Sequence, residues 1–247
     1  MSDLLKMVEI EVNHHCNKTC SYCPNSVAER KNTGEMSEEL FLKLMNDLVD
    51  MGYEGSISYE FYNEPMLAKK IMWFVETTRK YLPKSFIFFY SNGTLLSREK
   101  FLKLNELGVD RFIITKHEKT PHLLFEKVYE QLDEDLKKKV QFQHHTELKL
   151  TNRGGTVKAG PDEIPALTPC YLPSFLAVIT VNGNVLPCFE DFHEEQVMGN
   201  IEKNHLNDIW TNEKFTHFRT QLKRGQRHLH SPCKNCNRLQ VLYQRPS

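Results

Sequence analysis

The seven cysteines of the chain fall into two groups that lie far apart in the sequence, and any fold must gather each group around a site of its own. The first group lies within the run CNKTCSYC and consists of Cys16, Cys20 and Cys23. The second group lies in the last third of the chain and consists of Cys170, Cys188, Cys233 and Cys236. An odd number of cysteines cannot all pair as disulfides, so metal binding or redox chemistry is the favoured interpretation.

The apolar pattern of the chain indicates its cellular compartment, and its charge balance indicates the class of ligand that it binds. The N-terminal run MSDLLKMVEIEV has no charged region followed by a long apolar one, and no stretch reaches the roughly 18 consecutive apolar residues of a membrane span. We therefore expect a cytoplasmic protein that does not enter the membrane. The 32 basic residues are balanced by 32 acidic ones, so the chain has no net positive charge that would attract it to nucleic acid or to an anionic membrane. A small-molecule ligand is expected.

Apolar runs of strand length alternate with helical periodicities through the first 155 residues, which is typical of βα units around a parallel sheet. The strands are predicted at residues 7–12, 56–62, 86–91, 111–115 and 147–151. The helices are predicted at residues 37–52, 68–80, 97–107 and 123–136. Because a complete eight-fold barrel needs about 200 residues or more, we expect an α/β fold with an open, abbreviated (β/α) barrel.

A Gly- and Pro-rich segment, GGTVKAGPDEIPALTPC, has no periodicity, and we place the domain boundary there, between residues 1–155 and residues 156–247. After it, LAVITV, Asn182-Gly183 and NVLPC predict a β-hairpin with a two-residue type I′ turn, in which both turn residues have positive φ. Apolar residues within 205–222 then predict one helix. The second cysteine group is therefore predicted to lie in a small C-terminal domain.

The two cysteine groups differ in the number of ligands that they offer. Three thiolates bind zinc together with a fourth ligand, for which His14 or His15 is available, or they bind three irons of a [4Fe-4S] cluster. In such a cluster one iron keeps an open position, as catalytic metal sites do. Four thiolates saturate either a structural zinc site or a second cluster. A zinc-stapled binding module without catalysis therefore stands as an alternative to an enzyme with two clusters.

The spacing of the first group, with an aromatic residue, Tyr22, before the last cysteine, resembles the signature loop of the radical S-adenosylmethionine (SAM) enzymes. The resemblance implies that the open iron binds SAM, and that cleavage of SAM gives a 5′-deoxyadenosyl radical that removes hydrogen from a substrate carbon. A second signature of that family is matched in FYNEP by Glu64 and Pro65, although Tyr62 and Asn63 replace its glycines. The SAM contacts that the resemblance implies are Tyr22, Asn63, Glu64 and Ser91.

The second group resembles the auxiliary-cluster domain, called twitch and similar to SPASM domains, of some radical SAM enzymes. The resemblance implies two [4Fe-4S] clusters, with all seven cysteines as their ligands. A fully ligated cluster has no vacancy for substrate, so its implied role is to accept one electron, which makes the reaction a two-electron oxidation of an alcohol. No GxGxxG motif for a nicotinamide cofactor follows a predicted strand.

The segments VEIEVN, YCPNSV, TGEM, NRGG, GNVLPCFEDF, VMGNI and CKNCN extend the resemblance over the whole chain, to the radical SAM dehydrogenases of aminocyclitols. It implies oxidation of 2-deoxy-scyllo-inosamine to 3-amino-2,3-dideoxy-scyllo-inosose in the biosynthesis of an aminoglycoside antibiotic, with flavodoxin or ferredoxin as the electron donor. It also implies that Arg153 is catalytic, holding the reacting hydroxyl and stabilising the developing alkoxide. The implied substrate contacts are Tyr90, His117, Arg153, Phe189 and Glu190.

Other reactions of the same two-cluster plan are alternatives. An epimerase usually returns a hydrogen atom from a cysteine thiol, and the seven cysteines are all assigned as ligands. A peptide-modifying enzyme usually needs a leader-binding domain, and none fits before the strand predicted at residue 7. Another aminocyclitol or a sugar is an alternative substrate.

Overall fold

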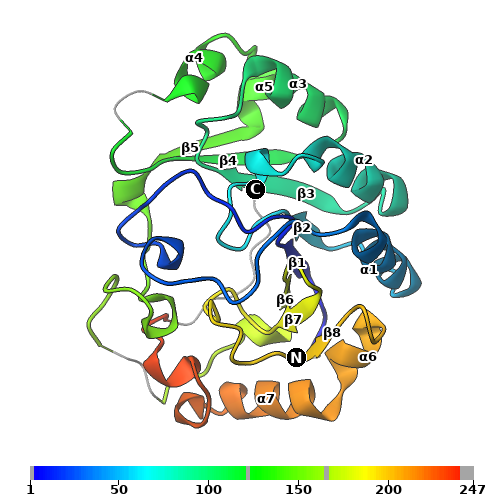
Figure 1. Ribbon diagram of the computed structural model, residues 1–247, viewed down its shortest axis with the longest axis vertical. Helices are drawn as coiled ribbons and strands as arrows, with labels where there is room; N and C mark the ends of the chain where they lie inside the picture. Colours follow the sequence, from blue (N-terminus) through cyan, green and yellow to red (C-terminus); the bar gives the residue numbers. More distant parts are fainter. Residues whose placement is uncertain (1–2, 121–122, 164–166, 240–247) are drawn as a thin grey trace.

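The computed structural model describes residues 3–120, 123–163 and 167–239, and its centre is a sheet with the strand order β5-β4-β3-β2-β1-β6-β7-β8 (Figure 1). Six neighbouring strands are parallel: β1 Met7–Ile10, β2 Ser56–Ser58, β3 Phe86–Ser91, β4 Arg111–Lys116, β5 Val140–His144 and β6 Leu176–Ile179. Two short strands, β7 Asn184–Leu186 and β8 Gly199–Asn200, add to β6 in antiparallel fashion. The open, mostly parallel sheet confirms the predicted fold class.

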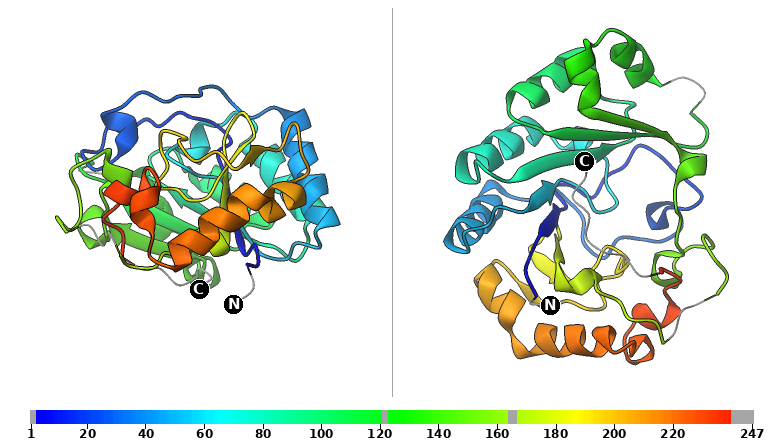
Figure 2. Two further views of the ribbon diagram at one scale, coloured as in Figure 1. Left: turned by 90° about the horizontal axis from the view of Figure 1, so that it is seen from below. Right: turned by 180° about the vertical axis from the view of Figure 1, so that it is seen from behind.

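The helices follow the strands in the predicted alternation, and they run along the outer face of the curved sheet (Figures 1 and 2). Their bounds are α1 Glu38–Asp50, α2 Ile71–Tyr81, α3 Arg98–Glu106, α4 Leu124–Glu130, α5 Glu134–Lys138, α6 Leu206–Thr211 and α7 Glu213–Lys223. Ser37 and Ser97 cap α1 and α3, since each side-chain oxygen accepts a hydrogen bond from the third backbone N–H that follows. None of the helices in the described part of the chain combines the length and apolar character needed to cross a membrane.

The two faces of β1 differ sharply in chemistry. Val8 and Ile10 point to the helices and belong to the main hydrophobic core, together with Phe41 of α1 and Phe74 of α2. The alternate residue, Glu9, lines a cavity on the inner face of the sheet. The helix side of the sheet therefore provides stability, and its inner side is free to carry polar groups.

Two predicted elements differ in the structure. The fifth strand is Val140–His144, so the prediction at residues 147–151 was wrong. β5 lies at the edge of the sheet and buries only Val140, while Phe142 remains exposed. The runs VQFQH and ELKLT each contain two apolar residues in alternation, so this pattern alone does not distinguish the strand from the segment after it. The helix predicted over residues 205–222 is two helices, because the side chain of Asn212 accepts a hydrogen bond from the N–H of Phe215 and starts α7 there.

The predicted hairpin is present, but its turn type differs. The N–H of Gly183 donates to the carbonyl of Thr180 over 2.8 Å, and that of Thr180 donates to the carbonyl of Asn184 over 3.0 Å. Gly183 has a φ of 82°, whereas Asn182 does not have a positive φ. The connection is therefore a three-residue turn that ends in a left-handed glycine, and not a type I′ turn.

The sheet continues across the linker between the two predicted domains. β6 pairs with β1 over four residues, from Met7 opposite Leu176 to Ile10 opposite Ile179. The division into residues 1–155 and 156–247 stays a prediction, and residues 164–166 of the linker lie outside the described residues. The strands β1, before the linker, and β6, after it, are thus hydrogen-bonded neighbours in one sheet.

Candidate active site

A cavity of about 400 Å³ lies on the inner face of the sheet, a volume suited to small molecules. Its walls come from the ends of β1 to β4, from the first cysteine loop and from segments near the second cysteine group. The cavity brings together most of the site residues predicted from the sequence: Cys16, Cys20, Tyr22, Cys23, Asn63, Glu64, Tyr90, Ser91, His117, Arg153 and Phe189. Glu190 is the one predicted contact that does not line it.

The first cysteine group lies on the loop between β1 and α1, as predicted. Burial raises the pKa of all three thiols, to about 11 for Cys16, and the pKa of that thiol is raised further by Cys23 and Cys20. Three thiols that lie this close remain neutral unless a bound cation stabilises their thiolates. The chemistry of this donor set therefore fits a positively charged cluster core with three protein ligands.

Tyr22 is held in place by the segments that follow β4 and β5. Its hydroxyl lies 2.5 Å from Nδ1 of His117, and its ring stacks on that of His145 with a centroid distance of 6.5 Å. Burial lowers the pKa of His117 to about 4, so this imidazole is neutral and pairs with the phenol. Glu118 accepts hydrogen bonds from the backbone and side chain of Ser21. His117 thus fixes the cysteine loop as well as lining the cavity.

Glu64 is bonded to its neighbours on three sides. Its carboxylate accepts from the hydroxyl of Ser91 at 2.8 Å, from the N–H of Asn92 at 2.7 Å and from the N–H of Met66 at 3.1 Å. Asn63 turns back on its own loop, where its side chain bonds the backbone of residues 59 and 61. The carboxylate of Glu64 is therefore oriented rigidly at the cavity wall.

The second cysteine group lines a separate, smaller cavity. Burial raises the pKa of all four thiols, and neighbouring thiols of the group raise it further for Cys188 and Cys233. Across the described residues, no group of three or more His, Cys, Asp or Glu side chains is arranged to hold a metal ion. All four thiols line this one cavity, and four thiolates are the number that ligates an iron–sulfur core completely.

Arg153 lines the larger cavity from a segment with an unusual backbone. Its φ is 50°, and the glycines that follow have φ values of 66° and 96°. A Cβ at Gly154 would lie 2.6 Å from Cβ of Pro232, and one at Gly155 would lie 3.0 Å from Cβ of Asn235. The NRGG segment therefore packs directly on the loop that contains Cys233 and Cys236. A non-glycine residue with positive φ is uncommon and marks candidate functional sites.

Glu190 lies behind the cavity wall, where its carboxylate is bonded to three other side chains. The carboxylate accepts from Nε of Arg238 at 2.6 Å and from the hydroxyl of Thr151 at 2.9 Å, and it lies 3.8 Å from Arg153. The guanidinium of Arg238 also covers the ring of Phe189 at 4.6 Å. Glu190 thus lies beside the two arginines and outside the lining of the cavity.

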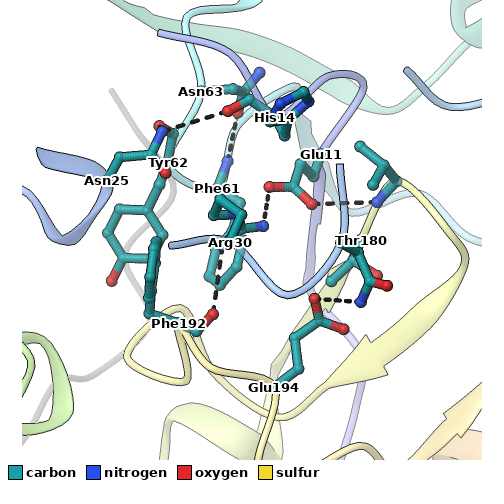
Figure 3. Close-up of polar contacts among 12 residues, drawn as sticks. Glu11, His14, Asn25, Arg30, Phe61, Tyr62, Asn63, Thr180, Phe192 and Glu194 are labelled. Carbon is teal, nitrogen blue, oxygen red and sulfur yellow. Dashed lines mark hydrogen bonds and ion pairs between the residues drawn. The ribbon is translucent and has the colours of Figure 1, made fainter. Parts of the chain in front are cut away.

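A buried ion pair lies within the segment between β1 and α1, and its arginine, Arg30, also contacts Phe192 on the loop that carries Glu190 (Figure 3). Arg30 bonds the carboxylate of Glu11, with side-chain exposures of 5% and 0%. The guanidinium is sandwiched between the rings of Phe61 and Phe192, 4.8 Å from each centroid, and donates to the carbonyl of Phe192. Asn32 adds a bond of 2.8 Å to Glu194. We call this group, Glu11, Arg30, Phe61 and Phe192, the Arg30 clamp.

Several polar residues of the cavity were missed from the sequence: Glu9, Glu60, Tyr62 and Arg238. Tyr62 donates a hydrogen bond of 2.5 Å to the carbonyl of Phe189, which ties the loop after β2 to the second cysteine region. Glu9 could have been predicted from the sequence, because an acid inside an apolar strand must face a polar space or a partner. Arg238 follows the last cysteine at no recognisable spacing, and only its position in space identifies it.

Two family models match the chain. Residues 10–145 match the radical SAM superfamily, and residues 170–237 match SPASM, an iron–sulfur cluster-binding domain. Over 241 residues the chain is 47% identical to the S-adenosyl-L-methionine-dependent 2-deoxy-scyllo-inosamine dehydrogenase of Niallia circulans, which covers 98% of this chain and 96% of the relative. These matches decide against a zinc-stapled binding module.

Solved structures agree with this assignment. BtrN in complex with AdoMet, another abbreviation of SAM, and 2-DOIA superimposes with a TM-score of 0.91 at 48% identity, covering 97% of this chain and 95% of that chain. BtrN in an open conformation gives a TM-score of 0.79 at 41% identity, with 96% and 94% covered. The two matched families imply SAM and two iron–sulfur clusters as cofactors, as predicted from the cysteine spacing. With a family model matched over more than half its length, this chain belongs to the radical SAM superfamily.

Proposed function

We propose that this chain is a radical SAM dehydrogenase that oxidises a secondary alcohol of an aminocyclitol, 2-deoxy-scyllo-inosamine, to the ketone 3-amino-2,3-dideoxy-scyllo-inosose in aminoglycoside biosynthesis. The observation that carries the proposal is the position of the cavity between the two cysteine groups. Cys16, Cys20 and Cys23 line the cavity, and so does Arg153, whose neighbours Gly154 and Gly155 pack against the loop of the second group. The relative from Niallia circulans, which covers nearly the whole chain, supports the same substrate.

The two cofactor sites are suited to different parts of one oxidation. When bound, SAM on the first cluster supplies a radical that takes a hydrogen atom from the alcohol carbon, and the second cluster accepts one electron, so that loss of the hydroxyl proton completes a ketone. Cys16, Cys20 and Cys23 would hold the first cluster, with Tyr22, Asn63, Glu64 and Ser91 beside SAM. Cys170, Cys188, Cys233 and Cys236 would hold the second.

Arg153 is the residue that we propose acts on the hydroxyl. An arginine remains protonated, so it stabilises a developing alkoxide by donating hydrogen bonds rather than by taking the proton itself. Its side chain lines the cavity and is 23% exposed, so its guanidinium can reach a ligand there. Tyr90, His117 and Phe189 line the same space and are proposed as further substrate contacts. For Glu190 we propose the supporting role of orienting Arg153.

We further propose that a small electron carrier, flavodoxin or ferredoxin, reduces the first cluster. Cys16 also lines a second, more open pocket, together with His15, Asn17 and Lys69. This pocket lies at the surface, where His15, Asn17 and Lys69 are exposed. The first site is thus approachable from outside while substrate occupies the inner cavity.

The direct test is anaerobic turnover of 2-deoxy-scyllo-inosamine with SAM and a reductant. Deuterium at the oxidised carbon should appear in 5′-deoxyadenosine, and one ketone should form for each SAM cleaved in a coupled turnover. A Cys233→Ala, Cys236→Ala double variant should still cleave SAM but form no ketone. Undiminished ketone in that variant would exclude the second cluster as electron acceptor, and deuterium retained on the carbon would exclude the dehydrogenase altogether.

A further inference from the structure

Two acidic side chains on the inner face of the sheet have no partner in the described part of the chain. Glu9 belongs to β1, and Glu60 lies two residues beyond the end of β2. Both line the active-site cavity, and no hydrogen bond or ion pair joins either carboxylate to another described residue. An acid in such a place has a cost in free energy unless a ligand or a proton neutralises it.

The strand register brings these two acids together. Glu9 pairs with Ser58 on the neighbouring strand, and Tyr59 packs its ring on Phe89 on the helix side, so Glu60 points to the same inner face as Glu9. One strand across and two residues along correspond to roughly 8 Å between Cα atoms. Two glutamate side chains at that separation can reach one small group between them.

Four cations line the cavity. Lys149 is exposed and is not among the charges that act on Glu9 or Glu60, and the other three have partners elsewhere. Arg238 and Arg153 flank Glu190 at 2.6 and 3.8 Å, and Nζ of Lys18 donates to Thr120 at 2.7 Å. Burial raises the pKa of Glu9 to about 8, an effect that Arg238 and Arg153 reduce and Glu190 increases. For Glu60, burial and then Glu9 raise the pKa well above its usual range, against a lowering by Arg153. The pair therefore lacks a cation of its own.

We propose that Glu9 and Glu60 together form the subsite that binds the protonated amino group of the aminocyclitol. This inference rests on the proposed function and adds to it the feature that selects an amine. An ammonium group brings a positive charge and three donors, enough to satisfy one oxygen of each carboxylate with a further donor to spare. A neutral hydroxyl has one donor and no charge, so it satisfies only one of the two acids.

The same geometry argues against the other use of such acids, as the acceptor of the hydroxyl proton. That task needs one carboxylate, whereas the cavity holds two on adjacent strands with only acceptor atoms between them when ionised. The binding of one ammonium group between them accounts for the presence of both carboxylates. It also predicts that the pair gives up a proton when substrate binds, because the cation lowers the pKa of each acid.

The test measures binding to the holoenzyme, with both clusters and SAM present, by anaerobic titration calorimetry. The ligands are 2-deoxy-scyllo-inosamine and the deoxyinositol analogue that has a hydroxyl in place of the amine. Glu9→Gln and Glu60→Gln should each weaken binding of the amine by about 10- to 100-fold and change binding of the analogue far less. Repeating the titration in buffers of different ionisation enthalpy should show proton release in the wild type that falls in both variants.

Controls separate this inference from the function on which it rests. Glu202→Gln, at an exposed position outside the site, should bind like the wild type, and iron content and thermal stability show that the Glu9 and Glu60 variants are folded. If the wild type binds the amine but both variants keep its preference over the analogue, the subsite is refuted while the proposed function stands. A fall in kcat with unchanged affinity, or an equal loss of SAM affinity, also refutes it. If the wild type binds no amine and forms no ketone, both fail.

Discussion

Removing the guanidinium of the Arg30 clamp is the most direct test of how the two halves of the site are joined. Arg30→Met keeps an apolar stem between Phe61 and Phe192 but leaves Glu11 without its partner. Because both side chains are almost fully buried, loss of one partner is expected to cost about 3 to 5 kcal/mol. For a chain of this length, that corresponds to a fall in Tm of roughly 6 to 20 °C.

The assay is anaerobic thermal unfolding of the holoenzyme, followed by circular dichroism. Burial already raises the pKa of Glu11 to about 7, an effect that Arg30 reduces, so the abandoned carboxyl would take up a proton. The double variant Arg30→Met, Glu11→Gln carries no such acid and should regain part of the lost stability. Lys84→Met, which removes an exposed pair with Glu54, should leave Tm unchanged. A fall in Tm of less than about 2 °C in Arg30→Met would refute the clamp. So would a fall in Tm of the double variant that equals the sum of the falls in Arg30→Met and Glu11→Gln.

Three further predictions concern the cavity. Arg153→Ala should lower ketone formation by about 100-fold or more with unchanged iron content, and wild-type turnover would remove Arg153 from the mechanism. Gly154→Ala should lower Tm and iron content more than Gly52→Ala, because both glycines have φ near 60° but only Gly154 lacks room for a Cβ; equal effects would contradict this. Without substrate, the raised pKa of Glu9 means that the folded protein retains a proton between about pH 4.5 and pH 8 that the unfolded chain has lost, so stability falls as pH rises through that window. Glu9→Gln should flatten this dependence of Tm on pH, and an unchanged slope would show that Glu9 is already ionised.

The sequence predicts those parts of the molecule that depend on local pattern. The cysteine spacing identified the family, and the βα alternation placed β1, β3 and β4 and the loop of the first cysteine group. β5 was misplaced because the runs VQFQH and ELKLT each contain two apolar residues in alternation, and the pattern alone does not show which of them forms the edge strand. The hairpin was found from Asn182-Gly183, but the dipeptide alone does not distinguish a two-residue turn from a three-residue turn.

The contacts that assemble the cavity could not be read from the sequence. Arg30 meets Glu11 and Phe192, which are 19 and 162 positions away. Arg238 meets Glu190 across 48 positions. No periodicity links such residues, and they become neighbours only when the folded sheet brings their loops together. Glu190 illustrates the consequence, since its place in the chain suggested a substrate contact and its place in space gives it two arginines as partners.

The pairing of β6 with β1 has a consequence for how the distance between the two redox centres is maintained. The first cysteine loop leaves the far end of β1, whereas Cys188 follows β7, which runs back to the level where β6 begins. The offset between the sites is therefore set by strand length, about 3.3 Å for each residue, and not by the linker. The loss of a residue pair from β1 or β6 would therefore change the path that an electron must cross.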